Sequence, residues 1–187
     1  MIIGICAVDE GGGIGAKGGL PWGHNKYDMK FFRLLTEGHS VVMGRVTWDS
    51  LPVKPLPKRD NIILSKSSGI KVINSEDYEE VLYGKEGDLK NLSDKSNMFV
   101  IGGASIFKLY EGMYDAFIIS NISGVNECDT YFPYDVIGDM VEVSAYGIHG
   151  NDNKLHIGLY VSEKILDTHK ELELYELVSD TAFKATM

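Results

Sequence analysis

Cysteine is scarce in this sequence, which has only Cys6 and Cys128 among its 187 residues. Two cysteines provide no disulfide framework and show no metal-ligand spacing, so we expect a reducing compartment. The five histidines are also scattered without ligand spacing, and we expect no metal site. The apolar run at residues 1–8 is too short for a membrane span and lacks the basic start of a signal peptide. These absences predict a cytoplasmic protein with no membrane partner.

Positive charge is scarce as well, because 18 Lys and Arg residues face 27 Asp and Glu residues and leave a net charge of −9. Nucleic acids and anionic membranes require a positive field, so we expect neither as a partner. The segment from residue 76 to 94 contains seven acids and two lysines. Positive residues are concentrated instead at Arg45, Lys54, Lys58, Arg59, Lys66 and Lys71. This concentration is either chance unevenness on a solvated surface or a basic mouth for an anionic small ligand.

Short apolar runs rich in Ile and Val recur along the first two thirds of the chain. Their lengths suit strands that are buried on both faces, and they lie at residues 1–8, 40–43, 61–64, 70–73, 98–101 and 116–119. Helical patterns separate several of them, at residues 25–37, 46–51, 75–82 and 104–111. This alternation predicts an α/β fold with a mostly parallel sheet, formed as a single domain over residues 1–187.

The C-terminal third has a different pattern. Apolar and polar residues alternate at residues 141–146 and again at 171–177, and residues 155–161 could form a further strand. Alternation with a period of two is typical of strands with one face in water. We therefore expect a mixed sheet whose C-terminal edge is antiparallel. The acidic segment 83–97 is predicted to be a surface loop.

A glycine-rich stretch follows the first apolar run. Six of the nine residues from 11 to 19 are glycine, and the stretch ends on Leu20-Pro21-Trp22. Gly13, Gly15 and Gly18 match the spacing of a dinucleotide-binding fingerprint, but that motif needs a helix where this chain has more glycine and a proline. The alternatives are a solvated loop and a lid that moves over a ligand. The apolar, stiff Leu-Pro-Trp end favours the lid.

Asp28 is the one acid on an otherwise apolar helical stripe. A helix that starts near Asn25 places Asp28, Phe31, Phe32 and Leu35 on one face, because their spacing is i, i+3, i+4 and i+7. The plain interpretation is a first-turn acid in a capping box with Asn25. The alternative is a carboxylate that holds a planar cationic or amidine-like ring between aromatic side chains. The two phenylalanines favour the alternative.

Two predicted strands are each followed by glycine and a short predicted helix. These turns span residues 44–47 and 102–105, and glycine at a helix N-terminus lets backbone N–H groups approach a phosphate closely. The alternative is a pair of ordinary strand-to-helix turns. Ser65-Lys66 could hold a further phosphate, and Arg59 in a basic turn could hold a carboxylate or simply be solvated.

Taken in order, these motifs resemble dihydrofolate reductase. The resemblance rests on Ala7-Val8-Asp9, Ile14-Gly15, Leu20-Pro21-Trp22, Asp28 with Phe32, and residues 42–51, 55–65, 100–107 and 129–133. Each motif is weak alone, but the ordered set is highly specific and covers residues 1 to about 135. It implies an eight-stranded, mostly parallel mixed sheet with flanking helices. It also implies NADPH-dependent reduction of 7,8-dihydrofolate to tetrahydrofolate, the one-carbon carrier of thymidylate and purine synthesis, by a monomer.

The resemblance also implies which residues form the site. Its catalytic set would be Asp28, Leu20, Trp22 and Ser120. Dihydrofolate would be bound by Ile3, Asp28, Phe31, Phe32, Leu51, Lys54, Leu56, Arg59 and Ile101. NADPH would be bound by Ile5, Ile14, Gly15, Gly19, Leu20, Gly44, Arg45, Val46, Thr47, Leu64, Ser65, Lys66, Ile101, Gly102, Gly103, Ala104, Ser105, Ile106 and Phe107. Within these sets, Asp28 pairs with the pterin, Ser120 supports it, and Arg59 binds the glutamate carboxylate.

Four features depart from the family pattern. The loop before Trp22 has extra glycines, one extra residue separates Trp22 from Asp28, Phe107 replaces a common tyrosine, and the C-terminus is longer. Two rival functions are considered. One is a related NADPH reductase of riboflavin-type synthesis, which does not use an acid at the Asp28 position. The other is a non-catalytic nucleotide-binding protein, against which the intact Asp28, Arg59 and both glycine turns argue.

Overall fold

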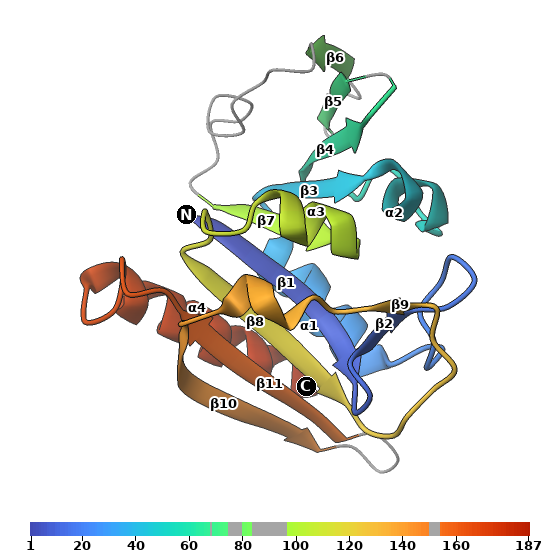
Figure 1. Cartoon of the computed structure of the whole chain (residues 1–187). Helices are drawn as coiled ribbons and strands as arrows, with labels where there is room; N and C mark the ends of the chain where they lie inside the picture. The colour runs from blue at the N-terminus through green and yellow to red at the C-terminus, as the bar shows by residue number, and fades with distance from the viewer. Residues whose placement is uncertain (68, 75–79, 84–96, 150–153) are drawn as a thin grey trace.

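The computed structural model describes residues 1–67, 69–74, 80–83, 97–149 and 154–187. A nine-stranded sheet forms its centre, in the order β10-β11-β8-β1-β7-β3-β4-β5-β6 (Figure 1). The strands are β1 Ile2–Asp9, β3 Ser40–Gly44, β4 Asp60–Ser65, β5 Gly69–Asn74, β6 Glu80–Tyr83, β7 Met98–Gly102, β8 Ala116–Ile122, β10 Val141–His149 and β11 Lys154–Val161. The helices are α1 Lys26–Thr36, α2 Arg45–Ser50, α3 Ala104–Leu109, the 3₁₀ helix η2 Tyr134–Ile137 and α4 His169–Thr186. A small second sheet pairs β2 Gly13–Gly15 with β9 Thr130–Tyr131.

The sheet is mixed and mostly parallel, as predicted. Strand β1 runs parallel to β7 and β8, and β3 runs parallel to β4 and β7. Strands β5 and β11 run in the opposite direction to the other seven strands of this sheet, which all point the same way. The antiparallel C-terminal edge is formed by β10, β11 and β8.

Two predicted elements are wrong. Residues 75–82 were expected to be a helix, but Glu80–Tyr83 is strand β6, the ninth strand, paired with β5, and residues 75–79 lie outside the described part. Residues 171–177 were expected to be a strand, but they lie inside α4. There the buried positions Leu174 and Val178 follow helical spacing, whereas Leu172 is exposed despite its place in the alternation. Most of the acidic segment 83–97 also lies outside the described residues.

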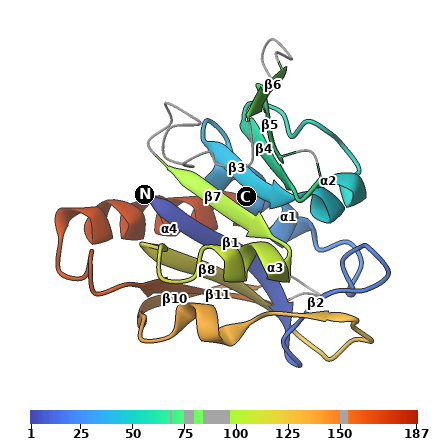
Figure 2. The ribbon, with the colours of Figure 1, turned by 45° about the horizontal axis from the view of Figure 1, so that its top comes forward.

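Helices cover both faces of the sheet (Figure 2). Ile3 and Ile5 of β1 point to the face covered by α1 and α4, whereas Ile2 and Val8 point to the face covered by α3 and η2. This follows from the alternation of side chains along a strand. None of the described helices is both long and apolar enough to cross a membrane.

The start of α1 is fixed by a side-chain cap. The Asn25 Oδ1 atom accepts hydrogen bonds from the backbone N–H groups of Tyr27 and Asp28, both at 3.1 Å. This confirms Asn25 as the N-cap, and it places Asp28 in the first turn of the helix. The cap therefore fixes the position of Asp28 at the start of α1.

We predict that Gly4→Ala destabilises the protein, because the Phe117 ring packs directly against Gly4. A Cβ atom at Gly4 would lie 2.2 Å from the ring of Phe117, its fully buried neighbour on β8. Overpacking of this kind costs about 1–3 kcal/mol, which would appear as a lower urea midpoint. Adding Phe117→Leu should recover part of the loss, and an unchanged midpoint in the single variant would contradict the close packing.

Candidate active site

Asp28 and Ser120 form a buried polar pair in the apolar face beneath α1. Asp28 is 9% exposed and Ser120 is 2% exposed. Ser120 lies on β8 opposite Ala7 of β1, and its hydroxyl makes a hydrogen bond with the Asp28 carboxyl. Burial raises the pKa of Asp28 from 3.8 to about 6, although the bond with Ser120 acts in the opposite direction. The carboxyl therefore changes charge close to neutral pH.

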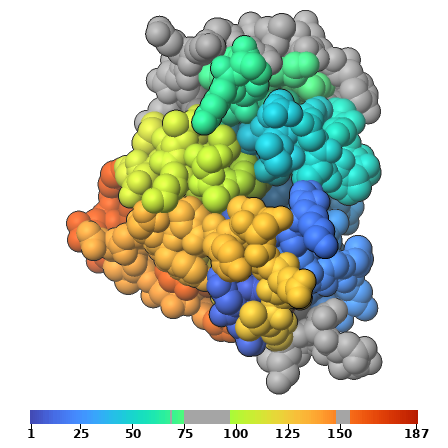
Figure 3. All heavy atoms as spheres, turned by 45° about the vertical axis from the view of Figure 1, so that its right-hand side comes forward, coloured from blue at the N-terminus to red at the C-terminus, as the bar shows by residue number. Residues whose placement is uncertain are grey.

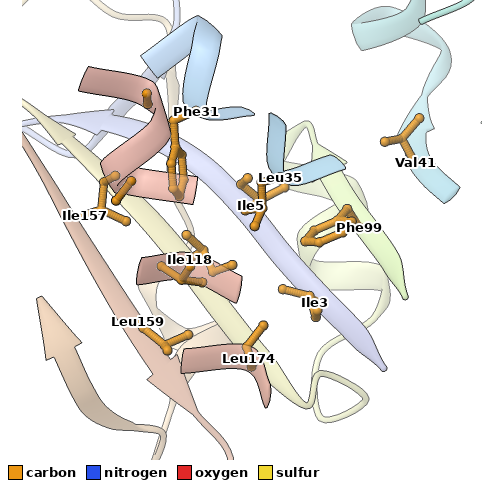
Figure 4. Close-up of a cluster of buried hydrophobic side chains, with 14 of the residues drawn as sticks. Ile3, Ile5, Phe31, Leu35, Val41, Phe99, Ile118, Ile157, Leu159 and Leu174 are labelled. Carbon is orange, nitrogen blue, oxygen red and sulfur yellow. The ribbon is translucent and has the colours of Figure 1, made fainter. Parts of the chain in front are cut away.

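The predicted pocket walls gather around this pair. They come from β1, β7, α1 and the loops beside α1 and α2, and they belong to one hydrophobic cluster: Ile3, Ile5, Trp22, Phe31, Phe32, Leu51, Leu56 and Ile101. Figure 4 shows Ile3, Ile5 and Phe31 of this cluster. The indole nitrogen of Trp22 is buried and is one of two such side-chain atoms in the described residues without a protein partner. A buried N–H donor of this kind suits a bound water or a polar ligand atom.

Arg59 is buried beside this cluster and is held in one orientation. It is 4% exposed, and its Nε, Nη1 and Nη2 atoms donate to Thr36 Oγ1, Pro57 O and Arg33 O at 2.8, 2.8 and 2.9 Å. The guanidinium carbon lies 5.9 Å from the centre of the Phe32 ring. Burial lowers the pKa of Arg59, yet an arginine stays charged. A fixed guanidinium beside a pocket aromatic suits a carboxylate ligand.

Two residues that position Arg59 were missed by the sequence analysis. Thr36 accepts from Arg59 and donates to the Phe32 carbonyl at 2.7 Å. Asn61 is fully buried, accepts from Leu56 N at 2.9 Å, and donates to the carbonyls of Leu56 and Arg59 at 3.1 and 3.0 Å. An asparagine that opens an apolar run was the available signal, since a buried amide there needs partners.

Lys54, a predicted contact of dihydrofolate, makes hydrogen bonds to the backbone of α2. Its ammonium group donates to the carbonyls of Trp48 and Asp49 at 3.3 and 2.9 Å. These carbonyls lie in the last turn of α2, where a cation interacts favourably with the helix dipole. Lys54 therefore caps the C-terminal turn of α2. Arg59 is the buried cation beside the hydrophobic cluster.

The two glycine turns come together at one edge of the sheet. The parallel strands β3, β4 and β7 end at Gly44, Ser65 and Gly102. The N-caps of α2 and α3, Gly44 and Gly103, have no side-chain cap bond. A Cβ atom at Gly44 would meet Ile106 at 2.9 Å, and one at Gly103 would lie 3.6 Å from Thr47 Oγ1. Figure 3 shows α2 and α3 side by side on the surface.

This edge also contains the other predicted phosphate contacts. Arg45, Val46 and Lys66 are exposed, and Arg45 forms an ion pair with Asp49 at 2.8 Å. Thr47 and Ser65 are half-buried, as are Ala104 and Ile106 of α3, whereas Ser105 is exposed. Hydroxyl, ammonium and guanidinium donors thus surround two helix N-termini, and this donor set fits an anionic ligand.

Phe107 does not line this edge. Its side chain is 1% exposed and packs edge-to-face against Phe117 and Phe132 on the opposite face of the sheet. A Cβ atom at Gly102 would lie 3.0 Å from the Phe107 ring, so the ring supports the turn from below. Ile14, Leu64 and Ile106 also pack against the hydrophobic cluster that contains Phe107, Phe117 and Phe132.

The first half of the glycine-rich stretch makes hydrogen bonds to the segment after β8. Gly13–Gly15 pairs with β9, and Asp129 accepts from Lys17 N at 2.7 Å and donates its backbone N–H to the Gly15 carbonyl at 3.0 Å. Beyond Lys17, a short bridge joins Ala16 to Gly19, and Leu20 is 48% exposed. The lid predicted for the stretch up to Trp22 stays a prediction.

Asp9 joins the glycine-rich stretch to the segment after β8. Its Oδ1 atom accepts from Gly11 N and Gly13 N at 3.0 and 2.8 Å. Its Oδ2 atom accepts from Asn126 N and Nδ2 at 2.8 and 3.1 Å, and the Cys128 thiol lies 3.6 Å away. Burial alone would raise the pKa of Asp9, but the hydrogen bonds from Asn126, Gly13 and Gly11 lower it overall.

We predict that Asp9→Asn loosens this junction and lowers stability by about 1–3 kcal/mol, because an amide would turn donors toward existing donors. The pKa of Asp9 is lowered on folding, so its stabilisation is present above the ordinary Asp value and is lost as the pH falls through the folded value. Urea unfolding measured at both pH values should show that the variant is less stable than wild type at pH 7 and that this difference is smaller at pH 3. An equal difference at both pH values would contradict the charged network.

Comparison with known proteins agrees with this geometry. The family model described as dihydrofolate reductase matches residues 1–159. A dihydrofolate reductase from Mycobacterium leprae is 38% identical over 151 residues, covering 78% of this chain and 85% of the relative. One from Schistosoma mansoni is 39% identical over 146 residues, covering 69% and 76%.

A solved structure has a similar fold. It is a dihydrofolate reductase from Enterococcus faecalis complexed with NADP(H) and RAB-propyl, with a TM-score of 0.71 and 25% identity. The match covers 87% of this chain and 96% of that one. The sequence resemblance is thereby confirmed: the chain belongs to the dihydrofolate reductase family.

Proposed function

We propose that the protein reduces 7,8-dihydrofolate to 5,6,7,8-tetrahydrofolate with NADPH, and so supplies a one-carbon carrier for thymidylate and purine synthesis. The observation that carries the proposal is the Asp28 carboxyl, which is buried among apolar and aromatic side chains and is supported by the Ser120 hydroxyl. Family membership supports the same reaction.

Asp28 recognises the pterin in this proposal. A carboxylate has two acceptor oxygens, which match the adjacent ring N–H and amino group of an amidine-like edge. Because the site excludes water, the ionised carboxylate favours a cationic pterin next to it. A protonated imine accepts hydride more readily than a neutral one.

The remaining polar groups orient the two ligands. Arg59, with Thr36 and Asn61 holding it, binds the glutamate carboxylate of the substrate. The edge formed by Gly44–Thr47, Ser65-Lys66 and Gly102–Ile106 fits the phosphates of NADPH. When bound, the cofactor supplies the hydride, so the protein needs no nucleophile of its own. Trp22 and the residues before it keep water from the pocket.

We propose further that the chain acts as a monomeric, single-domain enzyme in the cytoplasm. The low cysteine content supports a reducing compartment. Of the two rival functions, the riboflavin-type reductase is disfavoured by the acid at position 28. The non-catalytic binding protein is disfavoured because Asp28, Arg59 and both glycine turns are intact.

The direct experiment mixes the protein with NADPH and dihydrofolate and follows the loss of reduced-nicotinamide absorbance. We expect turnover that depends on both ligands. Absence of turnover would contradict the proposal, and binding of NADPH without turnover would favour a rival. Testing a riboflavin-type pyrimidine substrate in parallel distinguishes the two reductases.

Asp28→Asn should lose most of its activity near neutral pH and recover partly as the pH falls, because substrate then arrives already protonated from solution. The same variant should be more stable than wild type at pH 8. The folded protein raises the pKa of Asp28 from 3.8 to about 6, which disfavours the ionised form by roughly 3 kcal/mol.

This gain should largely disappear by pH 3, where the wild-type carboxyl is mostly neutral whether folded or unfolded. Rate profiles from pH 5 to 9 and urea unfolding at pH 3 and 8 measure both effects. Unchanged activity would remove Asp28 from its proposed role.

Arg59→Lys should raise the KM for dihydrofolate by about tenfold or more and change the KM for NADPH little. Lysine retains the charge but cannot make the two parallel bonds of a guanidinium. Lys58→Ala, which removes an exposed cation beside Arg59, is the matched control and should change neither KM. Equal increases in both KM values would contradict the assignment of Arg59 to the substrate.

A further inference from the structure

Helix α4 lies wholly beyond the family match, which ends at residue 159. It is 18 residues long and buries one continuous face in the core next to the sheet. The buried residues follow helical spacing and are Leu174, Val178, Thr181, Ala182 and Ala185. An added helix that buries a full face is an integral part of this fold.

Helix α1 is the closest partner of α4. Of the described helices and strands, α4 is the one whose backbone lies nearest to α1, and it also contacts β10 and β11. The two helices share the hydrophobic cluster that contains Phe31 and Leu35 of α1 and Leu174 of α4. Figure 4 shows Phe31 beside α4 and Ile157. Phe31 is fully buried and lies three residues after Asp28, on the same helix face.

The end of α4 meets the first turn of α1, which contains Asp28. A hollow of about 210 Å³ between them is lined by Lys26, Tyr27 and Lys30 of α1 and by Ala185, Thr186 and Met187. The small buried Ala182 and Ala185 allow this close approach. The lysines lie near the negative end of the α4 dipole, which favours the arrangement.

We infer that α4 is a positioning element for Asp28, because its buried face, which includes Val178 and Ala182, packs beside α1 in one cluster on the sheet and keeps Asp28 next to Ser120. The inference rests on the proposed function. The effect on Asp28 is transmitted through α1 and Phe31, which belongs to the same cluster. A catalytic group must be held within a fraction of an ångström, so slack in the supporting helix weakens substrate binding.

The test uses Val178→Ala in the full-length chain, with Leu172→Ala as control. Leu172 lies on the same helix but is 61% exposed, so its removal leaves the seam between α1 and α4 intact. Ala185→Gly is a milder second variant at the hollow, in case Val178→Ala folds poorly. Dissociation constants for dihydrofolate and for NADPH are measured separately by fluorescence, and amide exchange is followed in α1.

Val178→Ala should weaken dihydrofolate binding about fivefold, the factor for a loss of roughly 1 kcal/mol. NADPH binding should change less than about twofold, since its predicted contacts lie at another edge of the sheet. Amides of α1 should exchange faster, and Leu172→Ala should match wild type. Unchanged dihydrofolate binding in Val178→Ala and Ala185→Gly, or equal weakening of both ligands, would overturn the inference while leaving the proposed function intact. Wild-type protein that binds neither ligand would overturn both.

Discussion

Keeping the Asp28 carboxyl out of water is the constraint on which the site depends. Burying an ionised carboxylate costs free energy, and the raised pKa of Asp28 reflects this cost, because a buried carboxylate without a cation resists ionisation. The protein accepts this cost because several elements hold the acid in place. Asn25 caps α1, Ser120 of β8 makes a hydrogen bond with the carboxyl, and the aromatic side chains of α1 exclude water. A cationic substrate edge would relieve the same cost, which makes the free site poised for binding.

The other polar groups are organised on rigid elements around this acid. The Arg59 side chain is held by Thr36 of α1, the helix that also contains Asp28. Asp28 and Arg59 are therefore positioned by the same helix. The glycine turns lie at the carboxyl ends of β3 and β7, which are adjacent strands. Asp9 and Asp129 connect the glycine-rich stretch to the segment after β8. In the proposed function, the pterin, the glutamate and the phosphates would occupy separate subsites on one sheet.

Local patterns predicted much of this. The buried strands have continuous apolar runs, and Asp28, Phe31 and Phe32 share a helical face that a single sequence reveals. Helix α4 was mistaken for a strand because residues 171–177 alternate, and only the longer spacing of Leu174, Val178 and Ala182 distinguishes the two. Strand β6 depends on pairing with β5, which local propensity does not encode. Thr36 was missed because its partner Arg59 lies 23 residues away, and the bonds of Lys54 to the α2 backbone were missed because carbonyl acceptors leave no mark on a sequence.

The central claim is that the Asp28 carboxyl is a buried acid awaiting a cationic, amidine-like partner. Carbon-13 NMR titration of the Asp28 side chain in the free protein, and again with saturating folate ligand, measures this most directly. We predict a midpoint near pH 6 in the free protein. The midpoint should be clearly lower in the complex, because two N–H donors then stabilise the carboxylate. A midpoint near the ordinary Asp value of 3.8 in the free protein, or one that the ligand leaves unchanged, would contradict the account.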